Sequence, residues 1–217
     1  MRRTAVDFSR TLRDWDGFGV NYVEAAQTRD YRAAPQEYGG FSLLTEAQRG
    51  EIVDLIFGED GLKPGLIKMF LDPFHQEEPG SGYDFSPTAI DPDAYDHTTT
   101  TRWMRTFVRE GLALTRARSA DLRIITTLYG PPGWMTRQRF IRGRDIDPQR
   151  QHEVAKYLVA WARYLRDVEG FPVAYVGLHN EGEDWMRWPL DGSTDDAPNH
   201  DYNMHWPPEQ VVAFLKL

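Results

Sequence analysis

Residues 147–181 read DPQRQHEVAKYLVAWARYLRDVEGFPVAYVGLHNE, and this stretch carries the clearest fold signal in the chain. Asp147 is a helix-capping residue type, and Pro148 is favoured at the first position of a helix. Apolar residues then recur at intervals of four and three, which predicts a helix with one buried face. These residues are Val154, Leu158, Trp161, Leu165 and Val168. Gly170 ends the helix, and VAYVGL (173–178) follows as a strand after a short link.

The same two kinds of element alternate along the rest of the chain. Thr45 and Gln48 fit a capping box, which marks the start of one helix, and Gly58 marks its end. The predicted elements are strands at 17–22, 65–71 and 122–128, and helices at 45–58, 98–118 and 207–217. A strand followed by a helix, four times over, implies parallel strands with right-handed crossovers.

The connections between these elements fall into two groups that differ in length. Links from helix to strand are short, whereas links from strand to helix are long, and long loops in a compact domain are usually functional. The long links are residues 23–44, 72–97, 129–147 and 179–206. All four lie where parallel strands end, which is where α/β barrels keep their active sites. We therefore expect an α/β protein of the (β/α)8 TIM-barrel type, with only the first four βα units in this chain.

A doubly wound sheet is the alternative fold. Its phosphate-binding signature is missing, because GFGVNY (17–22) lacks the third glycine of a GxGxxG motif and leads into a long loop. The barrel prediction has a difficulty of its own, since a complete barrel needs roughly 250 residues.

Composition excludes several classes of function. The net charge of −8 argues against general nucleic-acid binding, and the local run of arginines at 137–144 reads as a solvated loop. There are no cysteines, so no disulfide and no thiolate nucleophile is expected. The sequence shows neither a signal peptide nor a membrane span, and the compartment stays undetermined. Tryptophan and tyrosine are abundant, with seven and ten residues, and they cluster with acids in a way that suits sugar rings.

Polar and aromatic residues follow each predicted strand. Those that we single out are Tyr22, Asp72, Tyr129, Trp134, Asn180 and Glu181. A carboxylic acid beside apolar groups has its proton affinity raised by desolvation and can act as a general acid. Glycoside hydrolysis needs such an acid to protonate the leaving oxygen, and retaining enzymes need a second carboxylate about 5–5.5 Å away. An adjacent amide such as Asn180 could bind the sugar 2-hydroxyl.

At these residues the chain resembles the glycoside hydrolases of clan A, most nearly family 30. The matching segments are GFG at 17–19, LYGPPGWM at 128–135 and HNE at 179–181, and the resemblance runs from about Asp16 to the end of the chain. It departs from the family pattern where Gly182 replaces the usual proline, and where Tyr129 with Gly130 replaces Trp-Ser.

The resemblance implies a retaining O-glycosidase that acts on a β-linked glycan or glycoside without a cofactor. It implies that Glu181 is the acid/base and Asn180 the 2-hydroxyl contact. It further implies sugar contacts by Tyr129, Trp134 and Asp72. Tyr22 and Trp185 are additional candidate aromatic contacts.

The resemblance also implies that residues 1–217 are the N-terminal half of a catalytic barrel, truncated before the nucleophile, a glutamate on strand seven. Two alternatives stay open. One is a non-catalytic carbohydrate-binding barrel derivative. The other is a half-barrel that pairs with a second copy of itself or with the missing C-terminal half. No metal site is expected, because the acidic segment 191–201 lacks the EF-hand pattern.

Overall fold

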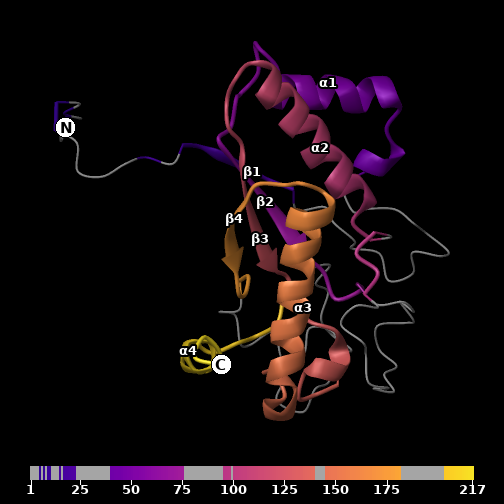
Figure 1. The fold of residues 1–217 in the computed structure, drawn as a ribbon, viewed down its shortest axis with the longest axis vertical. Coiled ribbons are helices and arrows are strands. Elements are labelled where there is room, and N and C mark those ends of the chain that lie inside the picture. Colours follow the sequence, from indigo (N-terminus) through magenta and orange to yellow (C-terminus); the bar gives the residue numbers. More distant parts are fainter. Residues whose placement is uncertain are drawn as a thin grey trace, which may run out of the picture.

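The computed structural model of the chain describes residues 5, 7, 9, 10, 15, 17–22, 40–75, 95–98, 100–139, 145–181 and 203–217. Strands and helices alternate along these residues (Figure 1). The strands are β1 (Gly19–Asn21), β2 (Leu66–Leu71), β3 (Arg123–Leu128) and β4 (Val173–Gly177). The α-helices are α1 (Glu46–Phe57), α2 (Arg102–Ala117), α3 (Gln151–Arg163) and α4 (Pro208–Phe214). The predicted strand–helix order is confirmed.

The four strands form one parallel sheet in the order β1-β2-β3-β4. Leu66 of β2 pairs with Gly19 of β1 and with Arg123 of β3, so the amino-terminal ends of these three strands lie level. The register between β3 and β4 shifts once, between Ile124 and Ile125. Each strand therefore lies beside the next strand in the chain, runs parallel to it and is joined to it through a helix. This is the arrangement predicted from the sequence.

The core lies between the sheet and helices α1, α2 and α3 (Figure 1). Alternate residues of the two central strands point to these helices and are fully or almost fully buried. They are Ile67, Met69, Leu71, Ile124, Thr126 and Leu128. Trp161 of α3 packs against this face, and its indole N–H donates to Oγ1 of Thr126 at 2.7 Å.

Helix α1 begins as the sequence predicts and packs against α2. The capping box is formed, because the Thr45 hydroxyl accepts from the Gln48 backbone N–H and the Gln48 side chain accepts from the Thr45 N–H. The ring of Phe57 approaches α2 so closely that a Cβ at Gly111 would lie 2.8 Å from it. A glycine at position 111 therefore allows the two helices to meet.

Helix α2 begins four residues later than predicted, at Arg102 instead of position 98. The threonines ahead of it use their side chains elsewhere. The Thr98 hydroxyl donates to Asp96 at 2.7 Å, and the Thr100 hydroxyl donates to Asp72 at 2.8 Å. Such local side-chain bonds favour turns over helix.

The end of the third helical segment corrects one prediction. Val168 is not on the buried face but is 70% exposed. The chain passes from α3 into a π-helix over Tyr164–Val168, which ends before Gly170 with its φ of 68°. A π-turn holds more residues than an α-turn, so the spacing that places Leu165 in the core turns Val168 away from it.

The face of the sheet opposite the helices is only partly covered by the described residues. Leu66, Lys68, Arg123 and Ile125 on this face are half-buried. The edge strand β4 is more open still, with Tyr175 at 43% exposure. We call this side the open face.

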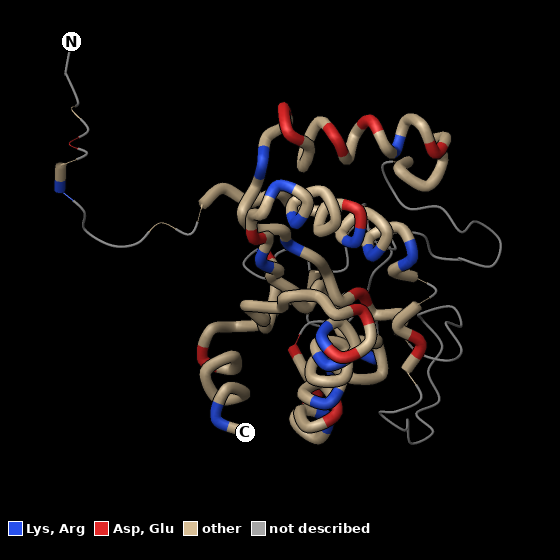
Figure 2. The backbone as a smooth tube through the Cα atoms, turned by 45° about the horizontal axis from the view of Figure 1, so that its top comes forward, with Lys and Arg blue, Asp and Glu red and all other residues tan. Residues whose placement is uncertain are grey.

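Charged residues of both signs are interleaved along the described helices (Figure 2). One ion cluster joins α2 to the end of the third helical segment, where Arg105 and Arg109 contact the two carboxylate oxygens of Glu169 at 2.5 and 2.6 Å. Within the described residues, no helix has the length and apolar character needed to cross a membrane.

Candidate active site

Four polar side chains are linked by hydrogen bonds, and we call them the polar chain: Lys68 within β2, Asn180 and Glu181 beyond the carboxyl end of β4, and Asn203 before α4. The Lys68 ammonium donates to Oδ1 of Asn180 at 2.7 Å. Nδ2 of Asn180 donates to Oδ1 of Asn203 at 2.9 Å, and Nδ2 of Asn203 lies 3.5 Å from Oε2 of Glu181. Three separate stretches of sequence therefore meet at Asn180 and Glu181.

Lys68 lies on the open face because side chains alternate along β2. Its ammonium lies 4.7 Å from the centre of the Phe70 ring, and Phe70 is two residues further along β2 on the same face. Burial lowers the pKa of Lys68, and the negative charge of Glu181 partly offsets this effect. The cation of Lys68 is thus stabilised by the ring and by the carboxylate.

Asn203 is nearly inaccessible, at 2% exposure, whereas Asn180 is half-buried and Glu181 is exposed. The inaccessible amide holds the more accessible side chains in place. The described residues do not form the enclosing apolar surroundings that we expected around Glu181.

Tyr129 connects to the polar chain through Phe70. The two rings lie 4.6 Å apart between centroids, and the Phe70 ring also contacts Lys68. The structure therefore brings Tyr129 into the same neighbourhood as Asn180. The Tyr129 ring is 4% exposed, and its contact with a sugar stays a prediction.

Asp72, the second carboxylate singled out in the sequence, lies in a different environment. It is fully buried, with Oδ1 accepting from the Phe74 N–H at 2.8 Å. Its Oδ2 accepts from the Thr100 hydroxyl at 2.8 Å and lies 3.1 Å from Nε2 of His75. Nδ1 of His75 is in turn 2.9 Å from Nδ1 of His97. We call Asp72, His75, His97 and Thr100 the buried network.

Aromatic rings surround the buried network. The His97 ring contacts Trp161, with centroids 5.5 Å apart, and Tyr164, at 5.1 Å. Burial and the neighbouring His75 lower the pKa of His97 to about 3, so His97 is neutral at physiological pH. Both Asp72 oxygens bond to protein groups, which favours a structural role, and its contact with a sugar stays a prediction.

The remaining predicted contacts are spread over the molecule. Tyr22 is 5% exposed, and its ring packs against Phe107 of α2, on the helix-covered side of the sheet. Trp134 lies in a short 3₁₀ helix, Gly133–Met135, is 2% exposed and has the Arg150 guanidinium 5.5 Å from its ring centre. Trp185 lies outside the described residues.

Sequence reasoning missed two members of the polar chain, Lys68 and Asn203. A signal existed for Lys68, because it is the one charged residue in the six-residue strand LIKMFL. Because successive side chains of a strand point to opposite faces of the sheet, Lys68 points to the face opposite the helix-facing residues. Asn203 carried no comparable signal, since it lies in a polar stretch far along the chain from strand β2.

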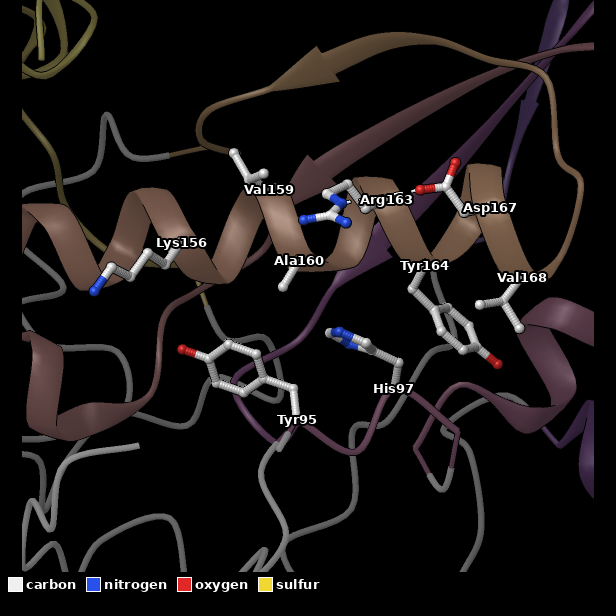
Figure 3. A pocket seen from close by; sticks show the side chains of 9 residues that line it. All are labelled: Tyr95, His97, Lys156, Val159, Ala160, Arg163, Tyr164, Asp167 and Val168. Carbon is white, nitrogen blue, oxygen red and sulfur yellow. Dashed lines mark ion pairs between the residues drawn. The ribbon is translucent and has the colours of Figure 1, made fainter. Parts of the chain in front are cut away.

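A hollow of about 440 Å³ lies on the outer side of α3 and shares no residue with the polar chain (Figure 3). Tyr95 and His97 form one wall, and Arg163 with Asp167, an ion pair at 3.9 Å, lies on the helix opposite. Among the described residues there is no group of three acidic or histidine side chains that could hold a metal ion.

Solved structures share this fold at low sequence identity. A conserved exported protein from Bacteroides fragilis matches with a TM-score of 0.62, 16% identity and 97% of this chain covered. SrfJ from Salmonella typhimurium matches with a TM-score of 0.62, 15% identity and 94% covered. The catalytic domain of GH30 xylanase C from Talaromyces cellulolyticus matches with a TM-score of 0.56, 16% identity and 96% covered.

The chain spans 41%, 39% and 43% of the lengths of these three proteins, respectively. The fold is half of a (β/α)8 barrel. The resemblance to glycoside hydrolase family 30 is confirmed at the level of the fold. No protein-family model matches the sequence, and no curated protein sequence matches it either.

Proposed function

We propose that this chain provides the acid/base half of the active site of a retaining glycoside hydrolase that acts on a β-linked glycan or glycoside. The observation that carries the proposal is the placement of Asn180 and Glu181 side by side, a few residues after the end of β4, where both connect to Asn203. In parallel α/β barrels this is the end at which active sites lie.

The proposed chemistry assigns Glu181 two successive tasks. As an acid it protonates the leaving glycosidic oxygen, while a second carboxylate attacks the anomeric carbon and forms the glycosyl-enzyme. As a base it then takes a proton from the water that releases the sugar. The exposure of Glu181 supports this assignment, because a substrate can reach the carboxylate. Asn180 binds the 2-hydroxyl of the same sugar.

The second carboxylate belongs to a part of the barrel that the four described strands do not include. The resemblance places it on a seventh strand, and the open face is where the other half of a barrel would pack. The exposure of Tyr175 on this face also supports the alternative in which a second copy of the chain supplies the missing wall.

The test compares the 217-residue chain with the longest product of the same coding sequence, each as wild type and as Glu181→Gln. We expect the longer product to hydrolyse β-glycosides and the 217-residue chain to show no turnover. Glu181→Gln should slow hydrolysis of glycosides with poor leaving groups by roughly 10²–10⁴-fold. Activated aryl glycosides should be affected far less, because they need little protonation.

Three other outcomes have distinct meanings. Equal losses on both kinds of substrate would show that Glu181 is not the acid. Saccharide binding without turnover by the longer product would favour the carbohydrate-binding alternative. Turnover by the 217-residue chain that is lost in Glu181→Gln would contradict the placement of the nucleophile on strand seven, and light scattering on that sample would tell a monomer from a pair of half-barrels.

A further inference from the structure

The hydrogen bonds of the polar chain all run in one direction, and Lys68 sets that direction. A lysine ammonium has three donors and no acceptor, so the Asn180 atom that faces it at 2.7 Å must be the carbonyl oxygen. The amide nitrogen of Asn180 then points the other way and donates to Asn203. Asn203 in turn presents its own nitrogen to the Glu181 carboxylate.

Each amide in this chain has two possible orientations with nearly the same shape. The cation at one end and the carboxylate at the other favour the same orientation of both amides. Asn203 is almost completely buried, so reversing either amide would place two donors or two acceptors against each other without water to separate them. Such a mismatch inside a protein is costly.

We infer that Lys68 is the positioning residue of the site: it fixes the orientation of Asn180, so that this amide offers a ligand an N–H donor and not a carbonyl acceptor. One N–H of Asn180 bonds to Asn203, and the amide nitrogen carries a second. The group recognised at this position is therefore an oxygen acceptor, such as a sugar hydroxyl accepting at carbon 2. This last step rests on the proposed function, whereas the orienting role of Lys68 does not.

The orienting role can be tested by NMR on the 217-residue protein. The variants are Lys68→Met, which removes all donors, Lys68→Arg, which keeps a donor-only cation, and Lys156→Met, which removes a lysine on the exposed side of α3. We expect the side-chain NH₂ signals of Asn180 and Asn203 to move and to exchange with water several-fold faster in Lys68→Met. Both signals should stay close to wild type in Lys68→Arg and unchanged in Lys156→Met.

Asn180→Asp provides a second test that leaves Lys68 in place. A carboxylate still accepts from Lys68 but cannot donate to Asn203, so the Asn203 NH₂ signal should exchange faster while the backbone spectrum is retained. Asn180 and Asn203 signals that are the same in Lys68→Met as in wild type would overturn the orienting role. So would a Lys68→Arg spectrum that matches Lys68→Met.

The consequence for recognition is tested with paired substrates, a β-glycoside and its 2-deoxy analogue, in the longer product defined above. Lys68→Met and Asn180→Ala should each lower kcat/KM on the 2-hydroxy substrate by roughly ten- to a hundredfold. Their effects should not add in the double variant, and both should nearly vanish on the 2-deoxy substrate. Equal losses on the two substrates would overturn the assignment of an acceptor hydroxyl to Asn180. A wild-type enzyme without turnover would instead count against the proposed function, and the NMR comparison would still decide the role of Lys68.

Discussion

Apart from Lys68, which lies within β2, the polar chain and the buried network are both built from residues that follow strand ends, yet their surroundings are opposite. In the buried network, Asp72 is inaccessible and both of its carboxylate oxygens bond to protein groups. In the polar chain, Glu181 is exposed and its hydrogen bond with Asn203 is long, at 3.5 Å. One carboxylate bonds within the protein, and the other is available to a ligand.

This difference separates stability from function. A buried polar group with all its partners in place holds elements together, and removing it leaves those partners unsatisfied. An exposed carboxylate contributes little to stability and can therefore be replaced without unfolding the protein. The three predictions below test this separation, beginning with the largest expected effect.

Removing the central acid of the buried network should destabilise the fold strongly. Asp72→Ala leaves the Thr100 hydroxyl, the Phe74 N–H and His75 without their acceptor, and we expect the free energy of unfolding to fall by about 2–4 kcal/mol. Urea denaturation followed by circular dichroism measures the loss. The exposed Asp121→Asn serves as control and should stay within about 0.5 kcal/mol of wild type. A loss no larger than that of the control would mean that the two carboxylates do not differ as described.

The buried network should also make the fold sensitive to acid. Burial and His75 lower the pKa of folded His97 to about 3, below the ordinary histidine value of 6.5. The unfolded chain therefore binds a proton that the folded chain does not, so this contribution is complete above about pH 6.5 and is lost as the pH falls towards 3. We expect the free energy of unfolding to fall with decreasing pH by at most about 1.4 kcal/mol per pH unit across that window.

The check on this sensitivity is His97→Asn, with the exposed His152→Asn as control. Unfolding free energies measured between pH 7 and pH 4 should fall less steeply in His97→Asn than in wild type. The slope in His152→Asn should match that of wild type. An unchanged slope in His97→Asn would place the acid sensitivity elsewhere in the molecule.

The smallest effect is expected in the polar chain. Glu181→Gln removes the negative charge that partly offsets the burial of Lys68, so the pKa of Lys68 should fall further. NMR titration of the Lys68 side chain measures this shift, with the exposed Glu209→Gln as control. The same sample should unfold within about 0.5 kcal/mol of wild type. A rise in the Lys68 pKa, or a large loss of stability, would remove the contrast with Asp72.

Sequence reasoning was most successful where the signal is local. The strand–helix order, the capping box at Thr45 and the placement of Asn180 and Glu181 after the fourth strand all follow from short patterns that the structure confirms. Reasoning was weaker where a side chain's direction depends on neighbours. Asp72 and Tyr22 follow strand ends as predicted, but their side chains contact residues on the helix-covered side.

The amino-acid sequence by itself determined which segments become strands and helices, because hydrophobic spacing, caps and glycines act over a few residues. It also determined that polar residues collect at one end of the sheet, since parallel strands all finish there. Only the tertiary structure decided which of those residues meet. Lys68, Asn180 and Asn203 are brought together by the packing of β2, the end of β4 and the segment before α4. The physical reason is that hydrogen-bond partners more than a hundred residues apart, such as Lys68 and Asn180, leave no periodic trace in the sequence.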